Sequence, residues 1–208
     1  MMGYIHGREA VPASARYNLL KTWGQTVVFW GVFLFLLPWG IWELETALGF
    51  APWRFGPYSL CGAVLFALGG ALGLTSGAIM AVKGRGTPLP ADCARELVVV
   101  GPYRYIRNPM AVAGLSQGVA VGLFLGSPAI VLYALAGGPL WHFLVRPWEE
   151  TDLERRFGAP YCAYRTAVKC WIPRVRSYRP PVSSHSMPAG PAFTTGTPNS
   201  SPAIPPLP

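Results

Sequence analysis

The chain has 208 residues, of which 51% are apolar and only 12% charged, and its formal net charge is +8. A typical soluble domain is about 25% charged. The apolar content excludes intrinsic disorder of the whole chain. Four cysteines without a CxxC pair give no support for a disulfide scaffold or a zinc site. Few charges, mostly of one sign, therefore need another explanation.

Three long stretches contain no Lys, Arg, Asp or Glu, at residues 23–42, 58–82 and 108–145. About 20 helical residues cross a hydrocarbon core of about 30 Å. The third stretch is long enough for two spans, and Gly126-Ser127-Pro128 places a turn near its middle. We therefore predict an all-α, polytopic membrane protein with four transmembrane helices, near 23–42, 58–82, 110–126 and 128–145. About 22 residues precede the first stretch, which favours a retained span over a signal peptide.

The positive charges predict the orientation of these spans. Sixteen of the 17 Lys and Arg residues fall in the N-terminal segment 1–22, the loop after the second span and the segment 146–179. Because such residues concentrate in cytoplasmic loops, we expect both termini in the cytoplasm, in a cell inner membrane. Basic residues that adjoin span ends also argue against a nucleic-acid partner. The final segment, 180–208, has no charge and nine prolines, which predicts a disordered tail.

The first patterned cytoplasmic segment is Leu97–Met110, LVVVGPYRYIRNPM. Gly101-Pro102 indicates a turn, and Pro109 suits the first turn of the third span, where a missing N–H costs little. Arg104 and Arg107 flank that helix start. An ordinary alternative is that these arginines only anchor a span at an anionic membrane surface.

The second such segment is Arg146–Arg174, RPWEETDLERRFGAPYCAYRTAVKCWIPR. Pro147 can open a helix, and the acidic residues of its first turn, Glu149 and Glu150 among them, match the positive end of the helix dipole. Gly158 followed by Pro160 predicts its end, and a second short helix is expected near 161–171. A capped interfacial helix explains this pattern without any site.

Both segments lie at the cytoplasmic ends of the last two spans, which form a hairpin. We therefore expect Arg107 and Asn108 to meet Glu149 and Glu150 at one membrane face, around a cavity suited to a small zwitterionic or cationic ligand. His142 lies near the same span end. An ionisable residue in a membrane is a candidate for function, but a purely interfacial role for His142 is equally open.

The ordered combination of GPYRYIRNPM, an apolar hairpin and EETDLERRFGAPYCAYRTAVKCWIPR resembles the isoprenylcysteine carboxyl methyltransferase family and its relatives, which include phospholipid N-methyltransferases. The likeness covers about Leu97–Arg174. Arg107 and Pro109 match the motif before the hairpin, and the Glu149–Glu150 pair matches the acidic pair after it. Two positions depart: Asn108 stands where the family has His, and Ala111 where it has Tyr.

The resemblance implies a membrane methyltransferase that takes its methyl group from S-adenosylmethionine and needs no metal. It implies a lipid-like or lipidated acceptor, with carboxylate O-methylation favoured. Phospholipid amine N-methylation and a non-catalytic protein that keeps the scaffold are the alternatives. The expected catalytic residues are Arg165 and Glu150. The expected cofactor-binding residues are Tyr103, Arg104, Arg107, Asn108, Pro109, Glu149, Glu150, Tyr161 and Tyr164.

Overall fold

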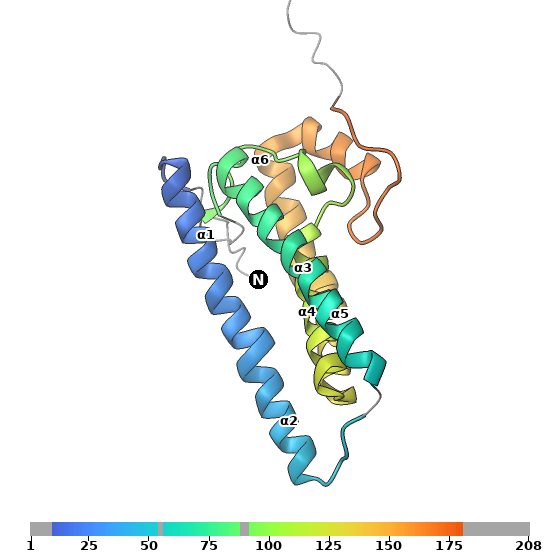
Figure 1. The fold of residues 1–208 in the computed structure, drawn as a ribbon. Coiled ribbons are helices and arrows are strands. Elements are labelled where there is room, and N and C mark those ends of the chain that lie inside the picture. The colour runs from blue at the N-terminus through green and yellow to red at the C-terminus, as the bar shows by residue number, and fades with distance from the viewer. Residues whose placement is uncertain (1–9, 54–55, 88–91, 181–208) are drawn as a thin grey trace, which may run out of the picture.

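The computed structural model describes residues 10–53, 56–87 and 92–180, and within these ranges long helices form the whole body of the molecule. Figure 1 shows them side by side, with the shorter segments gathered at one end. The elements are α1 (Ala15–Trp30), η1 (Gly31–Leu36), α2 (Leu37–Ala47), α3 (Gly56–Lys83), η3 (Gly101–Arg104), α4 (Pro109–Leu125), α5 (Pro128–Leu140), η4 (Trp141–Val145) and α6 (Arg146–Ala167). The predicted tail, 180–208, lies outside the described residues apart from Pro180.

Three continuous helices are long and apolar enough to cross a membrane, namely Ala15–Ala47, Gly56–Lys83 and Pro128–Ala167. The helix α4 is apolar and shorter, with 17 residues, and packs against both α3 and α5. The chain is therefore an all-α, polytopic membrane protein, as predicted. Each of the four predicted spans lies in helical segments of the structure.

The surface of the bundle has the polarity expected in lipid. Large apolar side chains such as Val27, Leu60 and Leu132 point outward, each with about two thirds of its surface exposed. The buried positions of α3 are small instead: Gly62, Gly69, Gly70, Ser76, Gly77 and Ala81. In lipid, apolar burial does not drive helices together, so association relies on close van der Waals packing. Small residues permit that packing because they let the helix backbones approach each other.

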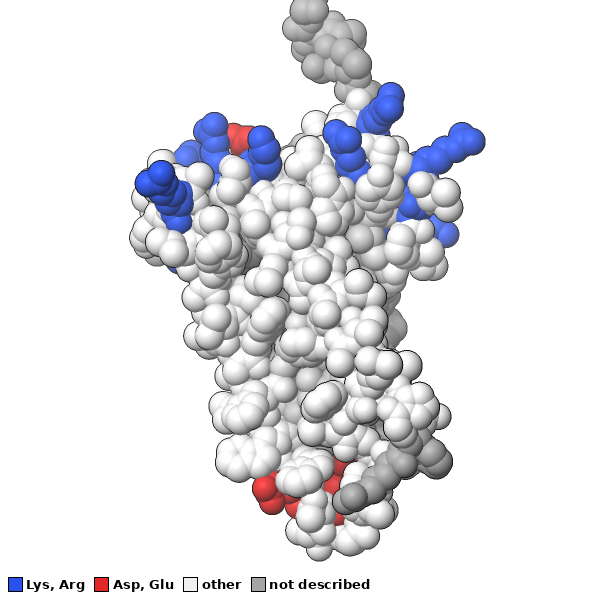
Figure 2. All heavy atoms as spheres, viewed as in Figure 1, with Lys and Arg blue, Asp and Glu red and all other residues white. Residues whose placement is uncertain are grey.

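The charges lie at the two ends of the bundle. Lys and Arg gather at the end where α3 finishes and α6 lies, whereas the charged side chains of described residues that Figure 2 shows at the opposite end are acidic. At that opposite end, the Glu45 carboxylate accepts hydrogen bonds from the Ser127 hydroxyl and from the Ala129 backbone N–H, the latter at 3.1 Å. These contacts cap the start of α5 after the turn, where Gly126 adopts a positive φ of 69°.

Two predicted helix starts differ from the structure. The first helix begins at Ala15, eight residues before the expected span start at 23, because Ser14 caps it by accepting a hydrogen bond from the Tyr17 N–H. The segment 146–179 does not open a separate helix at Pro147; the helix continues from α5 through η4 into α6. Pro147 falls where the π-helical turn of η4 passes into the α-helix, so its missing N–H costs little there.

The sequence predicts that the helix ends at Gly158 and Pro160, and the structure has an interruption at Gly158. Gly158 has a φ of 55° and a ψ of −134°, outside the helical region. Beyond Gly158 the backbone is helical again, and this second part of the helix ends at Ala167. The two parts of α6 therefore point in different directions, and the second part lies across the basic end of the bundle (Figure 1).

The α3–α4 contact depends on the absence of a side chain at Gly62. A Cβ atom placed there would lie 2.7 Å from the Ala120 carbonyl oxygen and 2.8 Å from the Phe124 backbone nitrogen. Both atoms belong to the backbone of α4, which cannot move aside as a flexible side chain could.

We expect Gly62→Ala to lower the free energy of unfolding by about 1–3 kcal/mol, the usual cost of overpacking. Thermal unfolding in detergent measures the effect. Gly40→Ala is the matched control, because a Cβ at Gly40 would meet nothing within 4 Å. Equal melting temperatures for the two variants would show that the α3–α4 contact does not depend on Gly62.

Candidate functional site

The candidate site lies at the basic end of the bundle, beyond the apolar part of the last span. The helix that begins at Pro128 runs to the break at Gly158, about 45 Å at 1.5 Å per residue, which exceeds a hydrocarbon thickness of about 30 Å. Its charge-free part is 128–145, so α6 extends past the membrane core. The charged residues of α6 therefore stand at or above the membrane surface.

Backbone geometry at the start of α4 places Arg107. Asn108 is the N-cap of α4, and its side-chain oxygen accepts a hydrogen bond of 3.0 Å from the Ala111 N–H. Pro109 follows as the first helical residue and is buried. The Arg107 N–H donates to the Lys169 carbonyl at 3.1 Å, which fixes the backbone on the other side. These contacts direct the Arg107 side chain toward α6.

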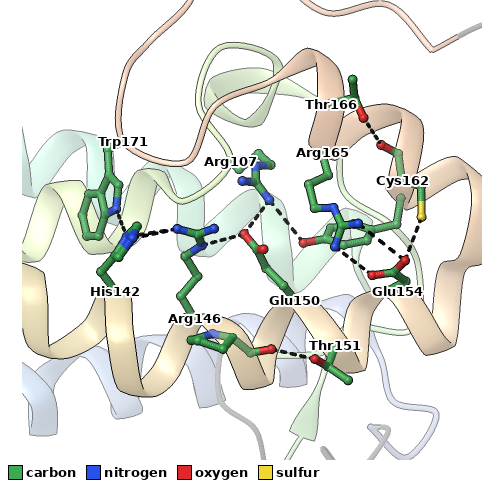
Figure 3. Close-up of polar contacts among 12 residues, drawn as sticks. Arg107, His142, Arg146, Glu150, Thr151, Glu154, Cys162, Arg165, Thr166 and Trp171 are labelled. Carbon is green, nitrogen blue, oxygen red and sulfur yellow. Dashed lines mark hydrogen bonds and ion pairs between the residues drawn. The ribbon is translucent and has the colours of Figure 1, made fainter.

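Glu150 is the centre of the site. Its Oε1 atom accepts from Arg107 Nη1 at 2.7 Å and from Arg146 Nε at 2.9 Å (Figure 3). The Arg107 and Glu150 side chains are only 11% and 15% exposed. Burial alone would raise the pKa of Glu150, but the two guanidinium groups outweigh it and hold that pKa below its ordinary value. Glu150 is therefore ionised at neutral pH.

Glu149 is in a different electrostatic state. Its carboxylate accepts no hydrogen bond from the part of the chain that the structure describes. Burial, with a smaller contribution from the neighbouring Glu150 charge, raises the pKa of Glu149 to about 7. Two adjacent carboxyls thus differ in protonation, because one faces two arginines and the other does not. Such a difference assigns different chemical tasks to the two groups.

Three tyrosines complete the wall of the site. Tyr161 accepts a hydrogen bond of 3.4 Å from Arg107 Nη1, and burial raises the pKa of its hydroxyl to about 12. Tyr164 donates to the Tyr103 carbonyl oxygen at 2.6 Å, and Tyr103 itself donates to the Ser76 carbonyl in α3 at 3.4 Å. These hydroxyls tie the second part of α6 to η3 and to α3.

The structure brings seven predicted site residues to one cavity. It has a volume of about 100 Å³, and its lining includes Tyr103, Arg107, Asn108, Glu149, Glu150, Tyr161 and Tyr164. Three predicted residues lie outside the lining. Pro109 is packed beside Asn108, Arg104 is in η3, and Arg165 pairs with Glu154 at 2.7 Å on the exposed side of α6. Arg165 meets the site only through the ring of Tyr161, 5.8 Å from its guanidinium carbon.

Reasoning from the sequence missed Arg146 as a site residue. Besides its bond to Glu150, its Nη1 atom lies 2.9 Å from Nε2 of His142, and the Trp171 indole N–H donates to Nδ1 of His142 at 2.8 Å. His142, Arg146 and Glu150 stand four residues apart in turn, so they share one face of a helix. This i, i+4 spacing is visible in the sequence and could have identified Arg146 as a site residue.

The donor set suits an amino-acid-like, zwitterionic cofactor such as S-adenosylmethionine. The buried Nε atom of Arg107 has no hydrogen-bond partner among the described residues, and the Glu149 carboxylate has none either. A buried polar group normally has a partner, so this pair could receive a carboxylate and an amino group. Ligand pockets usually have a volume of about 300–1,000 Å³, so the cavity would enclose one end of such a molecule.

Comparisons with known proteins find a family and a solved structure that match parts of the chain. Residues 58–160 match the family "Phospholipid methyltransferase". The solved structure of a eukaryotic intramembrane Ras methyltransferase, isoprenylcysteine carboxyl methyltransferase, matches with 20% sequence identity and a TM-score of 0.46. That match covers 81% of this chain and 56% of the other, so the chain spans little more than half of its relative's length. No curated protein matches the chain.

The matched segment 58–160 contains α3, α4, α5 and the first part of α6, and with them the Arg107–Glu150 pair and Glu149. The fold is that of an all-α, polytopic membrane protein, and the matched segment carries the candidate site. Over residues 58–160, just under half of its length, the chain is similar to the phospholipid methyltransferase family.

We expect Glu149 to make the stability of the protein depend on pH. The folded state holds the Glu149 proton up to about pH 7, whereas the unfolded chain releases it near pH 4.5. Stability should therefore fall as the pH rises through this window and level off above it. Melting temperatures of the wild type and Glu149→Gln in detergent test this, because the variant lacks the titrating group. Parallel curves for the two proteins would contradict the assignment.

Proposed function

We propose that the chain is an integral membrane methyltransferase that uses S-adenosylmethionine and acts on a lipid-like acceptor at the membrane surface. The observation that carries the proposal is the pairing of Arg107 with Glu150 beside the unpaired Glu149, at the end of the spans and within the segment that matches the family. The positive charges at this end support a cytoplasmic location for the site and for both termini, in a cell inner membrane.

The cofactor would supply an electrophilic methyl group carried on a positively charged sulfur. The protein's part is then to bind, to orient and to exclude water. In this proposal Arg107 holds the cofactor's carboxylate, Glu149 lies within reach of its amino group or of the acceptor, and Glu150 keeps Arg107 in place. Apolar lining residues such as Leu153 and Phe157 keep water away from the reacting atoms.

The environment of Glu149 favours an amine acceptor over a carboxylate. An amine that gains a methyl group must lose a proton, and a base with a pKa near the working pH is best suited to take it. Glu149 has such a pKa and no competing hydrogen bond. A carboxylate acceptor needs no base, and an ionised Glu149 would repel it. We therefore place phospholipid amine N-methylation ahead of the carboxylate O-methylation that the resemblance alone favoured.

We expect Arg107→Ala and Glu150→Ala to weaken binding of S-adenosylhomocysteine at least about 30-fold, because truncating one partner of a buried charge pair costs about 2–5 kcal/mol. Calorimetry with the detergent-solubilised protein measures the affinity. Arg155→Ala is the matched control, since Arg155 is half exposed and pairs only with Asp152.

Undiminished binding by both site variants would reject this cofactor site. Failure of the wild type to bind either the cofactor or its demethylated product would favour a non-catalytic protein that keeps the scaffold.

We expect Glu149→Gln to lower transfer of labelled methyl groups into the lipid fraction of membranes by about 10²–10⁴-fold, the usual contribution of a general base. The wild-type rate should rise with pH to a plateau above about pH 7, where Glu149 is ionised, and the variant should lose this rise. Radiolabel transfer across a pH series, with calorimetric binding of S-adenosylhomocysteine as a control, measures both effects. Unchanged activity of the variant, with a base-labile methyl ester as product, would instead support a carboxylate acceptor.

A further inference from the structure

The segment that follows α6, residues 168–179, crosses the site and is here called the C-terminal strap. Three backbone hydrogen bonds attach it to the chain before α4. The Lys169 carbonyl accepts from the Arg107 N–H at 3.1 Å, the Arg174 N–H donates to Tyr105 at 2.9 Å, and the Tyr178 N–H donates to Arg104 at 3.0 Å. The strap is therefore an ordered segment with a fixed position.

The outer side of the strap is both basic and apolar. It contains four cations, Lys169, Arg174, Arg176 and Arg179, and no acidic residue. None of the four forms an ion pair with another described residue. Between them stand Ile172, 62% exposed, and Val175, 98% exposed. Exposed aliphatic side chains among cations are the combination found in segments that lie at a membrane interface.

One aromatic contact gives the depth of the strap relative to the membrane. The Trp171 ring lies edge-on to Trp141, 5.2 Å between centroids, and its indole N–H bonds to His142. Both partners belong to η4, in the last turns of the charge-free stretch that ends at Val145. Trp171 therefore lies at the edge of the hydrocarbon core. Ile172 is its direct neighbour in the sequence.

We propose that the strap docks on anionic phospholipid head groups, with Ile172 and Val175 in the interfacial layer and the four cations among the phosphates. Basic residues at a membrane surface attract anionic lipids, and aliphatic side chains enter the layer beneath the head groups. The proposal does not rest on the methyltransferase activity. Because Lys169 bonds to Arg107, docking also holds the backbone of the cofactor site.

Limited trypsin cleavage after Arg174 and Arg176 tests the docking. The full chain is placed in nanodiscs of phosphatidylcholine alone or of phosphatidylcholine with phosphatidylglycerol, and the fragments are measured by mass spectrometry. We expect cleavage to be at least tenfold slower in the anionic discs, and high salt to remove the difference because it screens charges. Equal cleavage rates in the two lipid compositions would overturn the proposal.

Variants that keep both cleavage sites separate the two contributions. Lys169→Gln with Arg179→Gln should remove most of the protection, because each cation near an anionic surface contributes roughly fivefold. Ile172→Asn with Val175→Asn should speed cleavage in both lipid compositions, because the strap loses its apolar contact with the interfacial layer. Lys83→Gln with Arg155→Gln, which removes two cations at the same end of the bundle outside the strap, is the control and should keep full protection. Loss of protection in the control to the same extent, or full protection in both strap variants, would overturn the assignment.

Discussion

The site depends on one constraint, the position of the Glu150 carboxylate between Arg107 and Arg146. Arg107 belongs to the chain just before α4, and Arg146 is the first residue of α6. The carboxylate at 2.7 and 2.9 Å from the two guanidinium groups therefore joins two ends of a hairpin that the sequence separates by 43 positions. Since one anion satisfies two partly buried cations, loss of Glu150 would leave both unpaired, at a higher cost than loss of an exposed pair.

The membrane explains why this polar network lies where it does. Hydrocarbon offers no partner for an ionised side chain, so the charges accumulate where the helices leave it. Within the bundle the chain presents an apolar cavity of about 610 Å³ instead, lined by residues such as Trp39, Phe66 and Phe124. Phe66 is 17 positions before Lys83 on α3, about 25 Å below the basic end. That cavity is in the opposite half of the membrane and is not part of the candidate site.

Features that depend only on neighbouring residues could be predicted from the sequence, whereas most contacts between distant segments could not. Charge-free length identifies a span without reference to any neighbour, so the four helices and the Gly126-Ser127-Pro128 turn were predictable. The meeting of Arg107 with Glu150 was predictable too, because a hairpin leaves few alternatives. The continuation of the helix through Pro147 was not, since it depends on the π-helical turn of η4. Arg146 was missed because the acidic residues after Pro147 were interpreted as a helix start matched to the helix dipole, and the contact of Trp171 with His142 depends on a strap that has no regular pattern.

Asn108 shows how a departure from the family pattern can be structural. Where the family has His, this chain has the N-cap of α4, and the Asn108 side-chain oxygen is already occupied by the Ala111 N–H. Asn is among the best N-cap residues. Asn108 also does not titrate near neutral pH. The chain therefore gains a fixed start for α4 and a fixed Arg107 beside it, and Glu149 becomes the residue of the site whose protonation changes near neutrality. In the proposed amine chemistry, proton transfer is therefore a task of α6 and not of the segment before α4.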